Sequence, residues 1–321
     1  MNCPVCHASV DESPVLQRHH ECCLRECPRC SLQFWWPMKH PGKQWYEGCD
    51  NYGGTVFGTN KRRKFWNHSQ LLLEPLGRGE LVDVGCGPGA FLARAQSVGY
   101  SVTGIDFDRE AVEQARSVVG DHVYTLSLEE FLEKTDRRYD VVTFFEVLEH
   151  MDNPLEFMSA IRRVLKDGGH IALSVPNRCR WSRAINVSYV DFPPHHLTRW
   201  DTVSLGNFLR QCGFDVVTLR EQPLDIDGVL VPLFLIMPTR IVWHRLGRWF
   251  SRGRSRAGAT SPASPPRRLM RRAFVRLMRF LYLAHKVFLY PLAALLLPLL
   301  RLGGGRGMAL YACAKLRSDP Q

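Results

Sequence analysis

Apolar and polar residues alternate with two different periods through the middle of the chain. Short runs rich in Val, Ile, Leu and Phe are separated by stretches whose apolar residues recur at helical spacing, as in residues 108–119 and 153–165. Asn153 followed by Pro154 is a typical helix start, and the glycines at 168 and 169 are expected to end that helix. Strands that alternate with helices are typical of a doubly wound α/β sheet, which binds its ligand at the carboxyl ends of the central strands. We expect strands at residues 80–84, 101–105, 122–126, 139–144, 170–175 and 214–220, and residues 307–316 look like one more.

Composition narrows the class of protein. The chain has 321 residues, of which 45% are hydrophobic, enough for the core of one large domain with accessories or of two domains. Eleven cysteines are too sparse for a small disulfide scaffold. The chain opens on a cysteine pair and lacks the apolar stretch of a secretory signal, so we expect a reducing, cytoplasmic environment.

The formal net charge of +11 is concentrated in one segment. Residues 228–318 contain seventeen Lys and Arg and no Asp or Glu, whereas the rest of the chain is slightly acidic. Such a segment requires an anionic partner, and nucleic acid and a membrane surface are the two obvious classes.

Two cysteine motifs lie in the first 50 residues. Cys3 and Cys6 form one C-x2-C pair, and Cys27 and Cys30 form a second pair after 20 intervening residues, which is a zinc-ribbon spacing. Four thiolates would occupy all four coordination positions of a tetrahedral ion and leave none open for a substrate, so we expect a structural Zn²⁺ rather than a catalytic one. The alternative is a loop with free thiols, and the two His and two Cys within residues 19–23 could replace a ligand.

A glycine-rich loop follows the first strand of the central region. Residues 85–89 read Gly-Cys-Gly-Pro-Gly and precede a helical stretch. Glycines allow a tight turn there and a close approach of the backbone to a ligand. Asp106 ends the next strand, where a carboxylate can bind two ribose hydroxyls. The loop also fits the dinucleotide pattern G-x-G-x-x-G/A, so these residues alone leave both nucleotide-cofactor classes open.

Further motifs in the expected order carry a family resemblance. Residues 62–220 resemble the class I S-adenosylmethionine-dependent methyltransferases, and they are most similar to the group with the ubiquinone-biosynthesis O-methyltransferases and many small-molecule and sugar methyltransferases. The matching pieces are Val82-Asp83-Val84-Gly85-Cys86-Gly87-Pro88-Gly89, Gly104-Ile105-Asp106, Tyr139-Asp140-Val141-Val142, Glu146-Val147-Leu148-Glu149-His150, Leu165-Lys166-Asp167-Gly168-Gly169 and Gly213-Phe214.

This resemblance implies a domain organisation. A Rossmann-like sheet of seven strands would comprise residues 58–222 plus 306–318, with the last strand antiparallel beside the fifth. Residues 223–305 would then be a basic, apolar helical insertion before that last strand, and residues 1–50 a zinc-ribbon-like leader. Residues 27–37 are similar to the leader of some sugar methyltransferases, where it contributes to the substrate site. Ser31 stands where that leader usually has Gly.

The resemblance also implies S-adenosylmethionine as the cofactor. The backbone of the glycine loop and Asp83 would hold the methionine part, and Asp106 would hold the ribose. Ser127 and Leu128 would flank the adenine, and Phe145 would line the cofactor after the fourth strand. The whole expected set is Asp83, Gly85, Cys86, Gly87, Gly89, Asp106, Phe107, Ser127, Leu128 and Phe145.

Two histidines are candidates for the catalytic base. A sulfonium methyl group is already activated, so the enzyme mainly aligns the nucleophile and, for an oxygen, removes its proton. His150 follows the fourth strand and His195 lies in the loop after the fifth, although His150 could simply pack and His195 could order the next helix. In the ubiquinone-type enzymes, the residues matching Glu146, Glu149 and His150 are associated with a divalent metal.

The insertion combines arginines with apolar runs. Residues 268–281 place five arginines on one face of a helix, and residues 228–239 and 287–300 are uncharged runs of 12 and 14. Both runs are shorter than the roughly 20 residues of a membrane-spanning helix. We expect helices that lie on an anionic membrane surface, with a lid or a homodimer interface as the alternative and nucleic acid as a third.

Together these patterns predict a methyltransferase. The acceptor is expected to be a small molecule, a sugar or a lipid-linked saccharide methylated on oxygen or carbon, by a cytoplasmic enzyme peripheral to the inner face of the membrane. Alternatives are an rRNA or tRNA methyltransferase that uses the zinc module and basic insertion, and a zinc-ribbon binding module without activity.

Overall fold

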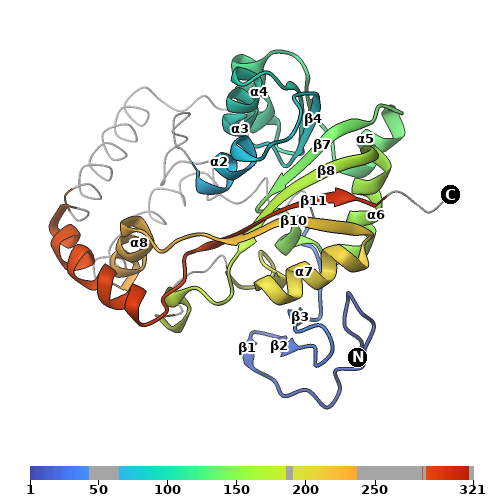
Figure 1. Ribbon diagram of the computed structural model, residues 1–321. Helices are drawn as coiled ribbons and strands as arrows, with labels where there is room; N and C mark the ends of the chain where they lie inside the picture. The colour runs from blue at the N-terminus through green and yellow to red at the C-terminus, as the bar shows by residue number, and fades with distance from the viewer. Residues whose placement is uncertain (43–64, 186–190, 237–283, 285–286, 318–321) are drawn as a thin grey trace, which may run out of the picture.

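The computed structural model describes residues 1–42, 65–185, 191–236, 284 and 287–317. Within these residues, seven strands form one sheet in the order β10-β11-β8-β7-β4-β5-β6 (Figure 1). β11 pairs antiparallel with β8 and β10, whereas the remaining neighbours are parallel. The Rossmann-like fold with a reversed last strand is therefore confirmed. Its strands are β4 (Glu80–Val84), β5 (Ser101–Asp106), β6 (Val123–Thr125), β7 (Tyr139–Phe145), β8 (Leu165–Pro176), β10 (Phe214–Glu221) and β11 (Ala309–Leu316).

Alternate residues of the central strands point to opposite faces of the sheet, and helices cover both faces. Leu81 and Val141 belong to one buried cluster, whereas Val82 and Val142 belong to the other. The helices that pack on the first face are α2 (Trp66–Leu73), α3 (Ala90–Ser97) and α4 (Arg109–Val119). Those on the second face are α5 (Leu128–Lys134), α6 (Pro154–Val164) and α7 (Thr202–Gln211).

One predicted boundary is wrong. Asn153 caps α6 as expected, because its side chain accepts a hydrogen bond from the Glu156 backbone N–H at 3.3 Å. The helix, however, ends at Val164, before the glycines, and β8 begins at Leu165 instead of residue 170. Leu165 is fully buried and pairs with Tyr139 of β7. Because the strand already begins at Leu165, Gly168 and Gly169 lie within β8 instead of ending the helix.

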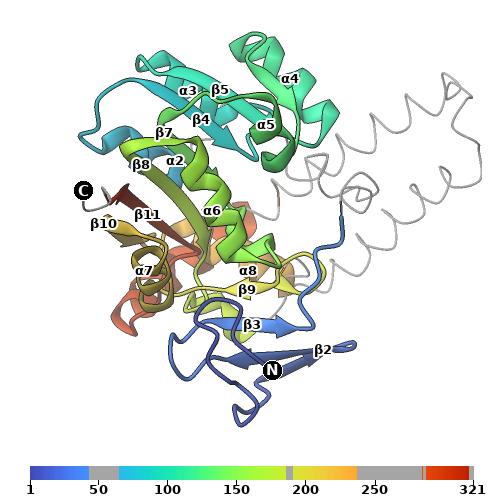
Figure 2. The same cartoon turned by 90° about the vertical axis from the view of Figure 1, so that its right-hand side faces the viewer.

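The leader forms a second, smaller sheet that the catalytic domain completes. Its strands are β1 (Gln17–His19), β2 (Cys22–Glu26) and β3 (Gln33–Trp36), and β3 pairs with β9 (Thr198–Arg199). Figure 2 shows β9 beside β3, although about 160 residues separate them. The Trp35 N–H also donates to the Leu197 carbonyl at 2.9 Å. The leader is therefore joined to the segment between β8 and α7, residues 177–201.

The described part of the insertion is a pair of packed helices. α8 (Ile226–Ile236) follows β10, and a helix over residues 287–302 precedes β11 (Figure 1). The two share a buried cluster of Leu224, Val229, Leu230, Leu289 and Ala293. Among the helices described, none has the length and apolarity to cross a bilayer. The predicted amphipathic helix at residues 268–281 lies outside the described residues.

Candidate functional site

The glycine loop at the end of β4 turns through backbone angles that favour glycine. Gly85, Gly87 and Gly89 have φ values of 75°, 51° and 78°. A Cβ on Gly85 would also lie only 2.8 Å from Cγ2 of Val147. The Gly87 N–H donates to Oδ2 of Asp106 at 2.8 Å, so the end of β5 fixes the loop. A side chain at position 85 would therefore strain the backbone and clash with Val147.

Two buried carboxyl groups lie beside this loop. Asp83 is 3% exposed and accepts a hydrogen bond from Oγ1 of Thr143 at 2.6 Å. Burial raises the pKa of Asp83 to about 7, and burial also raises the pKa of Asp106. Such carboxyls are poised to ionise when a cationic or hydroxyl-bearing ligand replaces the lost hydration.

The other residues expected at the cofactor lie at the same edge of the sheet. Ser127 follows β6 and caps α5, where its hydroxyl accepts from the Glu130 N–H at 3.2 Å, and Leu128 beside it is buried. Phe107 follows β5 and is half-buried. Phe145 ends β7 with its ring 4.9 Å from that of Phe91. The parallel strands β4, β5, β6 and β7 therefore end at the same edge of the main sheet, and all the expected cofactor residues lie at that edge. Their contacts with the cofactor stay a prediction.

The two candidate bases lie together in a cluster of histidines. Ring centroids of His150 and His195 are 4.5 Å apart, and His196 lies 4.9 Å from His150 and 4.7 Å from His195. His150 belongs to the short 3-10 helix η1 (Leu148–His150) after β7, whereas the other two lie just before β9. One ligand atom from each of the three lies within 4.8 Å of the others. The fold therefore joins histidines separated by 45 residues of sequence.

Burial controls protonation in this cluster. Desolvation lowers the pKa of His150 far below its usual value, lowers that of His196, and lowers that of His195 to about 3. Burial raises the pKa of Glu149, whose side chain is 1% exposed. All three imidazoles are thus neutral at physiological pH. An imidazole with so low a pKa is a weak base by itself. The close placement of the three rings therefore suits proton transfer by the cluster better than by one isolated histidine.

Several residues of the site were missing from the sequence prediction. His196 and Asp191 approach each other, with Nδ1 and Oδ1 3.5 Å apart, and Asp191 also forms a buried ion pair with Arg180. In the sequence, only its position next to the candidate base His195 could have marked His196 as a site residue. His68 on α2 packs 5.0 Å from the ring of Phe145, and desolvation lowers its pKa to about 3. Nothing in its sequence surroundings marks it as a site residue.

The glutamates implied as metal ligands have different surroundings. Glu146 accepts a hydrogen bond from Oγ of Ser174 at 2.7 Å, and Ser174 in turn accepts from Nδ2 of Asn67 at 2.7 Å. Glu149 instead faces the histidines, with Oε1 3.8 Å from Nε2 of both His150 and His196. The side chains that converge with His150 are therefore Glu149 and the histidines before β9, while Glu146 is held by Ser174.

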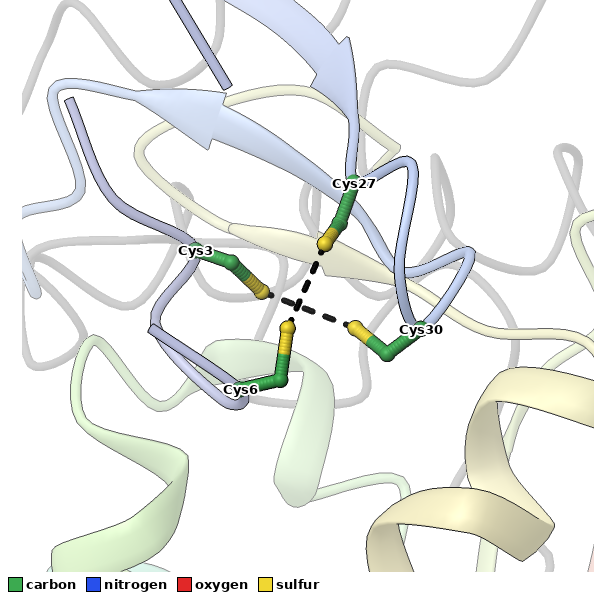
Figure 3. Close-up of side chains that lie close together, drawn as sticks. All are labelled: Cys3, Cys6, Cys27 and Cys30. Atoms are coloured by element: carbon green, nitrogen blue, oxygen red, sulfur yellow. Dashed lines mark hydrogen bonds between the residues drawn. The ribbon is translucent and has the colours of Figure 1, made fainter. Parts of the chain in front are cut away.

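The four cysteines of the leader converge on one point (Figure 3). Sγ of Cys3 lies 3.6 Å from Sγ of Cys30, and Sγ of Cys6 lies 3.4 Å from Sγ of Cys27. In each motif the residue after the second cysteine has a positive φ, 57° at His7 and 61° at Ser31. This left-handed turn explains why Gly is usual where Ser31 stands. Four sulfurs at these separations fit a tetrahedral metal ion.

Comparisons with known proteins agree with this geometry. A family model described as a methyltransferase domain matches residues 59–219. The ubiquinone biosynthesis O-methyltransferase of Vibrio atlanticus is 37% identical over 106 residues, covering 31% of this chain and 44% of that protein. The enzyme of the same name from Proteus mirabilis is 34% identical over 117 residues, covering 35% and 48%. The chain thus spans less than half the length of these curated relatives.

Among the solved structures that match this chain is a SAM-dependent methyltransferase from Archaeoglobus fulgidus. It is 17% identical, covers 83% of this chain and 98% of its own, and has a TM-score of 0.49. Because the family model spans half of the chain and the sheet has the expected topology, the chain belongs to the methyltransferase-domain family, within the class I S-adenosylmethionine-dependent group.

Proposed function

We propose that the chain transfers a methyl group from S-adenosylmethionine to an oxygen of a small-molecule or lipid-linked acceptor. The observation that carries this proposal is the shared edge of the sheet. The glycine loop after β4, the carboxylate ending β5 and the histidine cluster after β7 all lie at the carboxyl ends of neighbouring parallel strands. The ubiquinone-biosynthesis relatives named above favour an oxygen acceptor.

The roles of the residues follow from their chemistry. Bound S-adenosylmethionine supplies an electrophilic methyl group on a sulfonium. Asp106, whose carboxylate already accepts the Gly87 N–H, would bind the ribose hydroxyls, and ionised Asp83 would favour the positively charged methionine part. His150 and His195 would orient the acceptor hydroxyl together, and the pair rather than either ring alone would take its proton as the new O–C bond forms.

Transfer of labelled methyl groups tests the proposed reaction. The full chain is incubated with methyl-labelled S-adenosylmethionine and a fractionated cell extract, and the label is followed into lipids, RNA and soluble metabolites. We expect label in a lipid or metabolite fraction, and loss of that label with Asp106→Asn but not with Asp121→Asn at an exposed position. Label in RNA would support the rRNA or tRNA alternative, and no label in any fraction would contradict methyl transfer.

We also propose a structural zinc ion in the leader. Cys3, Cys6, Cys27 and Cys30 would bind it, and the ion would fix the two turns that lead into the small sheet. We expect purified full-length protein to contain one zinc per chain that is lost with Cys6→Ser plus Cys27→Ser. Retention of that zinc in the double variant, or a wild-type protein that never binds zinc, would contradict the assignment.

A membrane surface is the partner that we propose for the insertion. The helix over residues 287–302 packs one face on α8, and its other face exposes Phe288, Leu295 and Leu302, at 76%, 66% and 87%. These side chains lie in the segment with seventeen basic and no acidic residues, which would attract anionic lipid. Exposed apolar side chains beside a cationic sequence favour lipid over a solvated nucleic-acid groove.

Vesicle flotation tests this partner. Wild-type protein should float with phosphatidylglycerol vesicles and not with phosphatidylcholine vesicles. Phe288→Ser plus Leu295→Ser should reduce the bound fraction severalfold, whereas Val217→Ser, which removes an exposed apolar side chain from β10, should not. Failure of wild-type protein to bind anionic vesicles would contradict the proposal, and concentration-dependent dimerisation lost in the double variant would favour a homodimer interface instead.

A further inference from the structure

We infer that Arg183 and Arg199 form an anion subsite beside the histidine cluster, and that this subsite binds a phosphate group of the methyl acceptor. The inference rests on the proposed function for the acceptor itself, whereas anion binding can be measured without methyl transfer. The subsite lies where the leader meets residues 177–201, so both parts of the protein would recognise the acceptor.

The small sheet brings the two arginines together. Arg199 of β9 is directly opposite Gln33 of β3, and residues paired in this way direct their side chains to the same face of a sheet. Nη2 of Arg183, which follows β8 in the chain, donates to Oε1 of Gln33 at 2.9 Å. The guanidinium group of Arg183 therefore lies on the face of the small sheet that also carries Arg199.

The hydrogen-bond partners of both guanidinium groups are neutral. Arg199 donates to Oε1 of Gln17 at 3.1 Å and to the main-chain carbonyl of Asp191 at 3.2 Å. Arg183 donates to the amide oxygen of Gln33 and to a main-chain carbonyl at 3.0 Å. Neither group forms an ion pair with an Asp or Glu among the residues described.

The carboxylates nearby are already paired with two other arginines. Arg178 forms ion pairs with Glu26 and Asp201. Arg180 forms an ion pair with Asp191. The two arginines of the subsite therefore keep a positive charge that no neighbouring carboxylate compensates.

Partial burial makes this charge costly without an anion. Arg183 and Arg199 are half-buried, and desolvation lowers the pKa of Arg183 and lowers that of Arg199 to about 10. Because a guanidinium group stays charged at neutral pH, another polar group has to replace its lost hydration. Its planar fork of N–H donors matches the oxygens of a phosphate group. Two such forks on one face of a sheet favour a phosphate over a single carboxylate.

The subsite adjoins the histidine cluster. Asp191, whose carbonyl accepts from Arg199, also places Oδ1 3.5 Å from Nδ1 of His196. Cζ of Arg199 lies 5.7 Å from the centre of the Phe192 ring, and the main-chain N–H of His195 donates to the Phe192 carbonyl at 3.0 Å. A phosphate held by both arginines would therefore leave the rest of the acceptor close to the rings that we propose orient its hydroxyl.

Calorimetric titration of inorganic pyrophosphate into the full chain, at physiological salt, tests the subsite. We expect the dissociation constant to rise at least tenfold with Arg183→Gln plus Arg199→Gln. Arg183→Lys plus Arg199→Lys should recover only part of the affinity, because an ammonium group keeps the charge but not the planar fork. Arg138→Gln plus Arg163→Gln, which removes two exposed charges elsewhere on the molecule, should bind like the wild-type protein.

The labelled product of methyl transfer gives a second readout. We expect it to bind an anion-exchange resin and to lose that binding after treatment with phosphodiesterase and phosphatase. Butanol extraction of the untreated product then separates a lipid-linked phosphate from a soluble one. A labelled product that is neutral, or that stays acidic after both treatments, would overturn the inference.

The titration decides independently of the reaction. Absence of pyrophosphate binding by the wild-type protein, or unchanged binding by the glutamine double variant, would overturn the subsite. If no label is transferred at all, the proposed function fails, and the titration still tests the subsite. Should the glutamine variant fail to fold, as judged by circular dichroism, the lysine variant replaces it, and wild-type affinity in that variant would overturn the inference.

Discussion

Among single residues, burial sets the properties of the carboxyl groups near the glycine loop. Asp83 is almost fully buried, and the hydrogen bond that it accepts from Thr143 lowers its pKa less than desolvation raises it. The folded protein therefore keeps Asp83 protonated up to about pH 7, whereas an unfolded chain ionises it near pH 3.8. Ionising this group destabilises the ligand-free fold as pH rises through that interval, and a cationic ligand would reverse that effect.

We predict that S-adenosylmethionine binds more weakly below pH 7. If only ionised Asp83 favours the cofactor, the dissociation constant should rise by about tenfold per pH unit below the pKa. Calorimetric titrations between pH 5.5 and 8 would measure this slope. Asp83→Asn should flatten it, whereas Asp121→Asn should leave it unchanged. A wild-type affinity independent of pH would contradict the role of Asp83.

A second prediction concerns Gly85. Its positive φ and the Cβ position 2.8 Å from Val147 make Gly85→Ala costly, by about 1–3 kcal/mol of folding stability. Cofactor affinity should fall at least tenfold, because the loop must shift. Gly77→Ala is the matched control, since nothing lies within 4 Å of its Cβ position. Thermal melts and cofactor titrations measure both effects, and equal behaviour of the two variants would contradict the argument.

The residues of the site were only partly predictable from sequence. The family resemblance marked the expected cofactor residues, and each of them lies at or just after the carboxyl end of a strand of the parallel sheet. His150 and His195 were also marked, but not their convergence with Glu149 and His196, which depends on the path of the chain after β8. Asp191 and His68 carry no local pattern, because their roles come from tertiary packing alone.

Among the secondary-structure elements, β9 joins the leader to the segment that follows the histidine cluster. It is only two residues long, so neither length nor alternation distinguishes it from a loop. Pairing with β3 gives it a partner that no local pattern indicates, and it fixes the residues that follow His195 and His196. The early start of β8 has a similar cause, since buried Leu165 pairs with β7. The seven strands of the main sheet, by contrast, were predictable from their apolar runs.

We predict that Arg178 couples the leader to the histidine segment. Its guanidinium is 10% exposed, donates to the Ser31 carbonyl at 2.6 Å and forms an ion pair with Asp201. Breaking such a buried pair costs about 3–5 kcal/mol. Arg178→Gln should raise the KM for the acceptor severalfold and leave the S-adenosylmethionine affinity unchanged.

The matched control is Arg138→Gln. It removes an exposed ion pair in which a guanidinium nitrogen of Arg138 lies 3.9 Å from Oδ1 of Asp167. Steady-state kinetics together with cofactor calorimetry separate the two effects. Loss of cofactor binding in Arg178→Gln, with the fold intact, would contradict the role of Arg178 in coupling the leader to the histidine segment.

In the whole molecule, three parts meet at the edge of the main sheet where its parallel strands end, which is the catalytic edge that we propose. The main sheet supplies the cofactor loop, the leader holds the segment with His195 and His196, and the paired helices of the insertion attach beside it. Nε1 of Trp181, in the 3-10 helix η2 (Trp181–Ile185), donates to the Gly228 carbonyl at 2.9 Å and links that segment to α8. An apolar surface next to the catalytic edge suits an acceptor with a lipid part.

Removal of the zinc ion that we propose for the leader should therefore affect methylation of the acceptor more than binding of the cofactor. We predict that Cys6→Ser plus Cys27→Ser lowers methyl transfer by at least tenfold, because the small sheet no longer holds β9. S-adenosylmethionine should still bind, since the glycine loop belongs to the main sheet. Equal loss of both functions would contradict this separation, and the exposed Cys179→Ser serves as the control.

Calorimetric titration of S-adenosylmethionine into the full chain examines the cofactor site without knowledge of the acceptor. We predict one equivalent bound, with Asp106→Asn weakening the affinity at least tenfold because the carboxylate that orients Gly87 and faces the ribose is lost. Asp121→Asn should bind like the wild-type protein. A folded wild-type chain that releases no binding heat, or that binds equally well with Asp106→Asn, would contradict the assignment of this edge as the S-adenosylmethionine site.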